Sequence, residues 1–184
     1  LKETLNSDLY LAKLWDIRTL GFVGDSSVSE DVRPFLTSPD YPLREAAVLA
    51  LCRLRDLDSS ASLIGALNDR RTAVRQAAAL GLALLRPGKN EKMMSSLLIA
   101  INDQHAALRA AAASALGEIG DAQAIEALEK ATADVQDSVA VAATAARAVA
   151  SNESAEPQLL ILLASGRPRV AVEAARQLAR GGGE

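Results

Sequence analysis

Aliphatic residues recur along this chain at fixed distances from one position, which we call the anchor of each repeat. The anchors are Lys13, Arg44, Arg75, Arg109, Ala140 and Ala171, which lie 31, 31, 34, 31 and 31 residues apart. An aliphatic residue stands twelve positions before every anchor, and another stands eight positions before five of the six. Self-similarity at this period predicts a tandem array of small structural units.

Each repeat has the pattern of two helices. The two aliphatic positions are four residues apart and so share one face of a short first helix. A Ser or Asp six positions before the anchor is expected to end that helix and to cap the next one. These residues are Ser7, Ser38, Asp69, Asp103, Asp134 and Ser165. A longer second helix is then predicted, as in residues 43–54, 74–85 and 108–119.

Five of the six second helices carry alanine three positions after the anchor. These alanines are Ala47, Ala78, Ala112, Ala143 and Ala174. Apolar residues one before and seven and ten after the anchor share their stripe, so the alanines are expected to be buried. Their small side chains should let neighbouring helices approach closely. Loops such as the one at Gly120 are expected to stop these helices.

These patterns predict an all-α fold, a right-handed α-solenoid of about six two-helix repeats. The predicted units are residues 1–24, 25–55, 56–86, 87–120, 121–151 and 152–180, with a flexible tail at 181–184. The three extra residues of the 34-residue spacing are expected in the loop at 86–92. Because the first aliphatic column begins at Leu1, inside a helix, we expect the chain to be a piece of a longer protein.

Two of the second helices carry a resemblance to a known family. Residues 108–121, LRAAAASALGEIGD, and residues 74–85, VRQAAALGLALL, resemble the HEAT repeat in its short bacterial variety, which includes the phycobilisome lyases. The resemblance covers nearly the whole chain. It implies that the second helices line the concave side of a curved stack.

The resemblance also implies a ladder in which an Asp in the turn and an Arg six residues later interact along the stack. Asp69 with Arg75, and Asp103 with Arg109, match this pattern fully, whereas Asp134 keeps only the acid. We expect the ladder to fade toward the C-terminus. Because these residues recur at one repeat position, we predict that their role is structural and not catalytic.

The composition supports a helical, globular chain. Ala and Leu supply 37 and 28 of the 184 residues, and aromatic residues are only 3%, which is typical of helices and not of sheets. A net charge of −3 argues against a general polyanion binder. No apolar run reaches the roughly 18 residues of a membrane span, so we expect neither a membrane partner nor a membrane location. A single cysteine, Cys52, excludes an intramolecular disulfide and is consistent with the cytoplasm.

No catalytic residue, metal site or cofactor is predicted. His105, the single histidine, lies in a turn without neighbours that would complete a metal site, and it excludes the repeated His-Glu pairs of deoxyhypusine hydroxylase. Cys52 stands in a column of small residues and is interpreted as packing. Trp15 and Phe22 are also expected to pack, whereas Tyr41 could lie exposed at an edge and contact a partner.

A line of residues one, five and nine positions after the anchor lies away from the buried stripe of the second helices. We predict that this ridge binds a partner, because its middle is apolar. Its residues are Glu45, Leu49, Arg53, Gln76, Leu80, Leu84, Ala110, Ser114, Glu118, Val141 and Ala145. Alternatively, the stack is tightly curled, or missing parts of the same parent protein cover the ridge, and the apolar strip is ordinary core.

Three functions remain open. The leading hypothesis is a non-catalytic scaffold that binds a protein partner on the concave surface. The second is an enzyme subunit similar to the bilin lyases that share this repeat variety. The third is a nucleic-acid-binding protein similar to the HEAT-like alkylpurine DNA glycosylases, which the small number of cations on the ridge disfavours.

Overall fold

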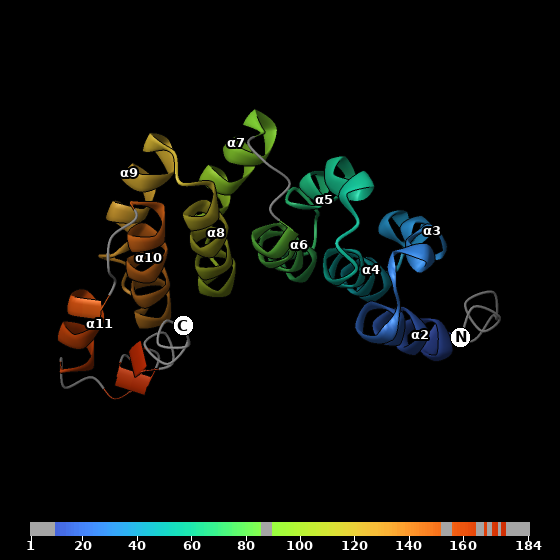
Figure 1. Cartoon of the computed structure of the whole chain (residues 1–184), viewed down its shortest axis with the longest axis horizontal. Coiled ribbons are helices and arrows are strands. Elements are labelled where there is room, and N and C mark those ends of the chain that lie inside the picture. The colour runs from blue at the N-terminus through green and yellow to red at the C-terminus, as the bar shows by residue number, and fades with distance from the viewer. Residues whose placement is uncertain are drawn as a thin grey trace. The chain divides into compact units, whose positions relative to one another are not determined.

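The computed structural model describes residues 10–85, 90–151 and 156–164, together with Pro168, Ala171, Val172, Ala174 and Ala175. This part of the chain consists of helices and turns and contains no strand (Figure 1), which confirms the predicted all-α fold. The chain divides into two compact units, unit 1 (Leu1–Pro87) and unit 2 (Gly88–Glu184). The predictions made for residues 1–9, 86–89 and 181–184 lie outside the described residues.

Unit 1 alternates short helical segments with long helices. In chain order these are α2 (Tyr10–Val23), a 3₁₀ turn (Ser26–Val28), α3 (Ser29–Val32), a 3₁₀ segment (Arg33–Thr37), α4 (Tyr41–Arg53), a 3₁₀ turn (Leu57–Ser59), α5 (Ser60–Ala66) and α6 (Thr72–Leu85). The long helix α4 packs against both α2 and α6 (Figure 1). The first helix before α4 is broken into pieces because Pro34 has no backbone N–H to donate.

Unit 2 repeats the same alternation. Its helices are α7 (Glu91–Ala100), α8 (Ala106–Ile119), α9 (Ala122–Ala131), α10 (Asp137–Ala150) and α11 (Glu156–Leu163). The long helices α8 and α10 pack against each other (Figure 1). Helix α8 ends at Gly120, which has the left-handed φ of 62°, and this confirms the predicted stop. Asp121 then caps α9 by accepting a hydrogen bond from the N–H of Ala124 at 2.9 Å.

The alanines three positions after the anchor face the interior in both units, as predicted. Ala47, Ala78, Ala112, Ala143 and Ala174 are each 0% exposed. In unit 1 they are accompanied by large aliphatic side chains such as Ile17 and Leu51, also 0% exposed. Burial of these side chains supplies the main favourable term for folding, at about 25 cal/mol for each Å² of apolar surface removed from water.

Neighbouring second helices approach each other so closely that a methyl group would not fit at one point of the contact. A Cβ added to Gly21 of α2 would lie 2.6 Å from Cα of Ala50 in α4. A Cβ added to Gly117 of α8 would lie 2.9 Å from Cα of Ala146 in α10. Glycine is therefore required at both points, because backbone atoms cannot move aside as a flexible side chain can.

Between α4 and α6 the same contact is made with the two roles exchanged. Eight positions after the anchor, α2 and α8 have glycine, but α4 has Cys52. The glycine of this contact is on the other helix, at Gly81 of α6. A Cβ on Gly81 would lie 2.2 Å from Sγ of Cys52. Cys52 is thus a packing residue, as its column suggested, and it depends on the glycine opposite.

Candidate partner-binding surface

The exposed side chains of the long helices in unit 1 are all aliphatic, aromatic or arginine. We call this set the second-helix surface of unit 1. It comprises Tyr10, Leu11, Trp15, Arg18, Phe22 and Val23 on α2, Tyr41 and Arg53 on α4, and Leu80 and Leu84 on α6. These three helices expose no carboxylate and no lysine within their described bounds.

The α2 part of this surface carries two large aromatic residues. Trp15 is 68% exposed and Phe22 is 71% exposed, so the expectation that they pack in the interior is wrong. The reason is their position on the helix: at 100° per residue they lie opposite Ile17 and Leu20, which fill the core side. Helix α2 is therefore apolar on two faces, and only one of them is covered.

Aromatic rings on this surface hold arginines. The guanidinium carbon of Arg53 on α4 lies 4.0 Å from the ring centroid of Phe22 on α2. That of Arg71, which immediately precedes α6, lies 5.0 Å from the ring centroid of Tyr41 on α4. Both distances are within the range of cation–π attraction. Tyr41 is 40% exposed, which agrees with the exposed edge position predicted for it.

The long helices of unit 2 present a different surface. Their exposed residues are Ala107 and Glu118 on α8 and Ser138 and Val149 on α10. Between these helices lies a hollow of about 140 Å³, whose lining includes Ser114, Glu118 and Val149. The small side chains leave little apolar area, so this face is a poorer interface than its counterpart in unit 1.

The predicted ridge is only partly exposed. Arg53, Leu80, Leu84 and Glu118 are exposed, whereas Glu45, Leu49, Gln76, Ala110, Ser114 and Ala145 are partly buried. Val141 is 0% exposed and belongs to a core cluster with Leu159 of α11 and Ala174, so its placement on the ridge is wrong. On α4, α6 and α8 the ridge residue nine positions after the anchor is exposed, and Leu80 is an exposed ridge residue at the middle position. The predicted ridge began at α4 and did not include Leu11 and Arg18, which are exposed on α2.

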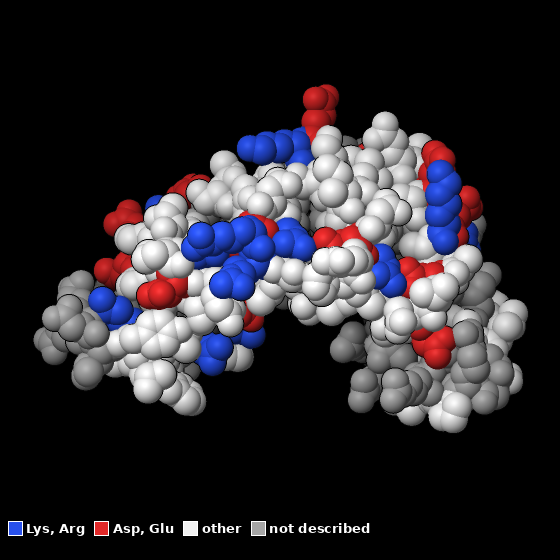
Figure 2. Space-filling model, turned by 180° about the vertical axis from the view of Figure 1, so that it is seen from behind, with Lys and Arg blue, Asp and Glu red and all other residues white. Residues whose placement is uncertain are grey.

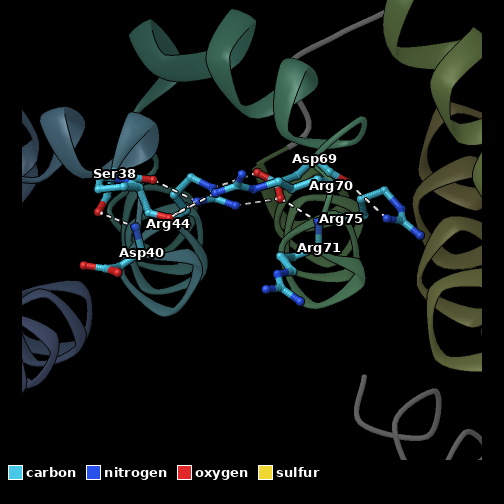
Figure 3. Close-up of polar contacts among 8 residues, drawn as sticks. Ser38, Asp40, Arg44, Asp69, Arg70, Arg71 and Arg75 are labelled. Atoms are coloured by element: carbon cyan, nitrogen blue, oxygen red, sulfur yellow. Dashed lines mark hydrogen bonds and ion pairs between the residues drawn. The ribbon is translucent and has the colours of Figure 1, made fainter.

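The acidic and basic residues of the turns form a ladder whose pairing differs from the predicted one. Arg44 Nε and Nη2 donate to Asp69 Oδ2 and Oδ1 at 2.8 and 2.9 Å (Figure 3). Arg109 binds Asp134 in the same forked way, at 2.7 and 2.8 Å. Each arginine therefore pairs with the Asp of the following repeat, 25 residues on. The predicted partner of Asp69, Arg75, donates instead to its backbone carbonyl at 3.0 Å.

The turn acids do not cap the long helices directly. Asp69, Asp103 and Asp134 each accept a hydrogen bond from the N–H two residues on, at 2.8 Å. In the last two cases that residue, His105 or Gln136, occupies the N-cap position, and its own side chain makes no capping bond. Each carboxylate thus stabilises the turn that precedes the long helix, because an Asp side chain readily accepts a hydrogen bond from the backbone N–H two residues on.

A further forked pair was missed in the sequence. Arg33 donates to both carboxylate oxygens of Asp56, at 2.9 and 2.6 Å, and Ser59 also donates to Asp56. Asp56 is only 6% exposed. Asp56 and Arg33 are 23 residues apart, which does not match the spacing of the anchors, so the repeat pattern could not predict this pair.

These contacts shift the pKa values of the carboxyl groups. Hydrogen bonds from Arg33 and Arg109 lower the pKa of Asp56 and of Asp134. For Asp69, burial opposes ionisation, but hydrogen bonds from Arg44 and the Arg71 N–H outweigh it and lower the pKa. A carboxylate that is paired in the folded chain stabilises the fold wherever it is ionised.

The remaining chemical candidates have no reactive environment. Burial raises the pKa of the Cys52 thiol to about 12, so it stays protonated and a poor nucleophile near neutral pH. His105 is exposed, with Nδ1 2.8 Å from Asp103 Oδ1. No group of three potential metal ligands occurs among the described residues. No described helix combines the length and the apolar character needed to cross a membrane.

The chain matches one protein family and is similar to several solved structures. The family profile described as HEAT repeats matches residues 1–83 and 61–150. Among solved structures, a chain of the CpcE–CpcF complex of phycocyanin lyase from Nostoc sp. PCC7120 is 23% identical, with a TM-score of 0.80 over 96% of this chain and 74% of that one.

Two artificial proteins are also similar in structure. An engineered protein is 20% identical with a TM-score of 0.66, covering 97% of this chain and 95% of its own. A designed armadillo repeat protein, solved in complex with the peptide (KR)4, is 18% identical with a TM-score of 0.58, covering 97% of this chain and 96% of its own. At these identities the likeness concerns the fold alone. The search of curated proteins gives no match.

Proposed function

Because this chain belongs to the HEAT-repeat family, we propose that it is a scaffold that binds a protein partner through the second-helix surface of unit 1. The supporting observation is the uniform character of that surface: every exposed residue of α2, α4 and α6 is aliphatic, aromatic or arginine. Tyr, Trp, Phe and Arg are the residues that protein interfaces prefer, whereas Lys, Glu and Asp are depleted there.

The cost of leaving such residues in water supports the same proposal. Trp15, Phe22 and Leu84 are each more than 60% exposed. Transfer of one such side chain from water into an interface contributes about 1.5–3 kcal/mol. Scattered apolar residues on a surface need no explanation, but eight large exposed apolar side chains on three helices that pack one against the next are typical of a docking site.

Substitutions on α6 test this proposal. We expect Leu80→Asp or Leu84→Asp to remove a specific partner, because an aspartate in the contact would have to lose its water. The partner is identified by crosslinking and mass spectrometry with the wild-type chain in extracts of the source cells. Binding of the isolated partner to each variant is then measured by calorimetry, and we expect a loss of at least about tenfold.

Leu57→Asp is the matched control. Leu57 is 58% exposed, close to the 64% of Leu84, but it lies in the 3₁₀ turn after α4 and not on a long helix. All variants are checked for helix content and thermal unfolding. If both α6 variants remain folded and bind the partner as well as the control does, the second-helix surface is not the docking site.

A second candidate function is that of a subunit similar to a bilin lyase. The observation that favours it is the similarity to a chain of the phycocyanin lyase complex over 96% of this chain. A bilin mixed with the purified chain should then change its absorbance spectrum, because binding restricts and desolvates the chromophore. An unchanged spectrum at saturating protein counts against this candidate and leaves the scaffold proposal intact.

A further inference from the structure

Resting on the proposed function, we infer that the second-helix surface of unit 1 takes an acidic amphipathic segment of its protein partner. Such a segment joins an apolar face to flanking Asp or Glu side chains. The inference rests on three observations: the sign of the exposed charge, the way in which the arginines are held, and the mixture of arginine with aromatic residues.

The first observation is a separation of charge within unit 1. Residues 1–87 contain 11 Lys and Arg and 11 Asp and Glu, so the unit as a whole has no excess of either sign. The exposed charges on α2, α4 and α6 are nevertheless Arg18 and Arg53 alone, and the one ridge acid there, Glu45, is partly buried. The exposed acids of the described part of unit 1 lie outside these helices, at Asp25, Glu30, Asp40 and Asp58.

The second observation is that the arginines near this surface are oriented but not neutralised. Arg53 lies over the ring of Phe22, and Arg71 lies over that of Tyr41. A guanidinium stacked on a ring keeps its in-plane N–H groups free to bind a carboxylate with two hydrogen bonds. Stacking also removes part of the rotational freedom that an isolated arginine would lose on binding.

The nearby acids are already engaged elsewhere. Arg44 neutralises Asp69, and Arg33 neutralises Asp56, through forked hydrogen bonds. Figure 3 shows the guanidinium of Arg71 directed away from Asp69, toward the opposite side of α6. No ion pair joins Arg18, Arg53 or Arg71 to an acid in the described part of the chain. In Figure 2 a group of basic side chains lies together on the face shown, and acidic side chains lie beside it.

The third observation separates a protein segment from a nucleic acid. A phosphate backbone requires a continuous strip of cations along its path. Here Arg18 lies on the same face of α2 as Leu11, Trp15 and Phe22, and Arg53 is the only exposed cation of α4. A surface of large apolar side chains with few arginines fits a segment that buries apolar groups and places a small number of carboxylates at its edges.

Three designed peptides of one length test the inference. Each is helical, has leucines on one face and carries a fluorophore, and they differ only in flanking residues, which are Glu, Gln or Lys. At low salt we expect the Glu peptide to bind the full chain at least about tenfold more tightly than the Gln peptide, and the Lys peptide to bind more weakly still. The measurement is fluorescence anisotropy.

Variants identify the arginines responsible. In the double variant Arg18→Gln, Arg53→Gln, which keeps Arg71, we expect the preference for the Glu peptide over the Gln peptide to fall to about threefold or less, while the affinity of the Gln peptide itself stays within about twofold. The double variant Arg55→Gln, Lys92→Gln removes two exposed cations outside the long helices and is expected to keep the full preference.

The outcomes separate this inference from the proposed function. Equal binding of the three peptides overturns the acidic partner but supports an apolar docking surface. A loss of preference in both double variants overturns the inference, because it indicates general attraction to the net charge. Failure of every peptide to bind a folded chain contradicts both. Tighter binding of a labelled single-stranded RNA, sensitive to Arg18 and Arg53, also overturns the inference and assigns the surface to nucleic acid.

Discussion

Units 1 and 2 have closely similar interiors and different surfaces. In both, alanine three positions after the anchor is completely buried, a glycine faces a small residue where two long helices meet, and an arginine forks onto the Asp of the next repeat. On the long helices, however, unit 1 exposes aromatic residues and arginines, whereas unit 2 exposes Ala107, Glu118, Ser138 and Val149.

This difference shows which features belong to the repeat and which belong to one place in the chain. A repeated contact is required by packing, because each pair of neighbouring long helices packs at a similar short distance. A feature confined to one unit has no such requirement. Phe22 stands nine positions after its anchor, where α4, α6 and α8 expose Arg53, Leu84 and Glu118. Packing of the repeat therefore does not require an aromatic residue there, and this is why Phe22 is included in the proposed docking surface.

The largest expected effect is on the close helix contacts, which should be equally sensitive in both units. Gly21→Ala and Gly117→Ala each force a methyl group against the backbone of the neighbouring helix. We expect each to lower the free energy of unfolding by about 2–3 kcal/mol, measured by urea denaturation. Gly65→Ala is the control, since nothing lies within 4 Å of its added Cβ.

The exchanged contact between α4 and α6 sharpens this test. Gly81→Ala should also destabilise unit 1, because its methyl group meets Sγ of Cys52. Adding Cys52→Gly should recover part of the loss, because the pair then has the same order as Gly21 with Ala50. If the double variant loses as much free energy of unfolding as the two single variants together, the close approach of the helices is not the reason for these glycines.

The ladder should contribute similarly in the two units, with a smaller effect. Arg44→Met and Arg109→Met each leave a partly buried carboxylate, Asp69 or Asp134, without its forked partner. We expect each to cost about 2 kcal/mol, below the value for a fully buried pair because both carboxylates retain some contact with water. If one variant costs several times as much as the other, the two ladder contacts are not equivalent.

The same pairs predict the response to acid. The pKa values of Asp56, Asp69 and Asp134 are lower in the folded chain than in the unfolded chain. Their contribution is therefore fully present above about pH 4, the unfolded value, and is lost as the pH falls through the folded values. In Arg44→Met the stability should decline less steeply below pH 4, because Asp69 has lost its main ionising partner.

The smallest expected effect concerns the ends of two long helices. Arg55 has a φ of 55° at the position, eleven after the anchor, where unit 2 has Gly120. A residue with a Cβ pays about 1 kcal/mol for this left-handed conformation, so Arg55→Gly should raise the stability of unit 1 by somewhat less than that. Gly120→Ala should lower the stability of unit 2 by a comparable amount. Thermal unfolding of the two variants measures both.

Much of the fold could be predicted from the sequence because the signals were local and repeated. The spacing of the aliphatic residues placed α4, α6 and α8 within two residues of their observed starts and ends. The buried alanines followed from the 3.6-residue period alone. The family resemblance rested on the same repeated residues and is confirmed by the match to HEAT repeats over residues 1–150.

The candidate site was predicted less well because it depends on neighbours. Position one after the anchor is partly buried at Glu45 but completely buried at Val141, where Leu159 and Ala174 cover it. The partner of Asp69 is Arg44 and not Arg75, because the turns of successive repeats lie next to each other, so an arginine can reach the Asp of the following turn. Neither outcome is encoded in the spacing within one repeat.

The sequence by itself determined the long helices and their buried alanine stripes, since both follow from the periodicity of one helix and the size of one side chain. Only the tertiary structure decided which uncovered faces remain in water, which acid each arginine binds, and that Phe22 and Arg53 meet across two helices. Exposure and pairing are properties of two or more elements together, and the sequence of one element contains no record of what the next one covers.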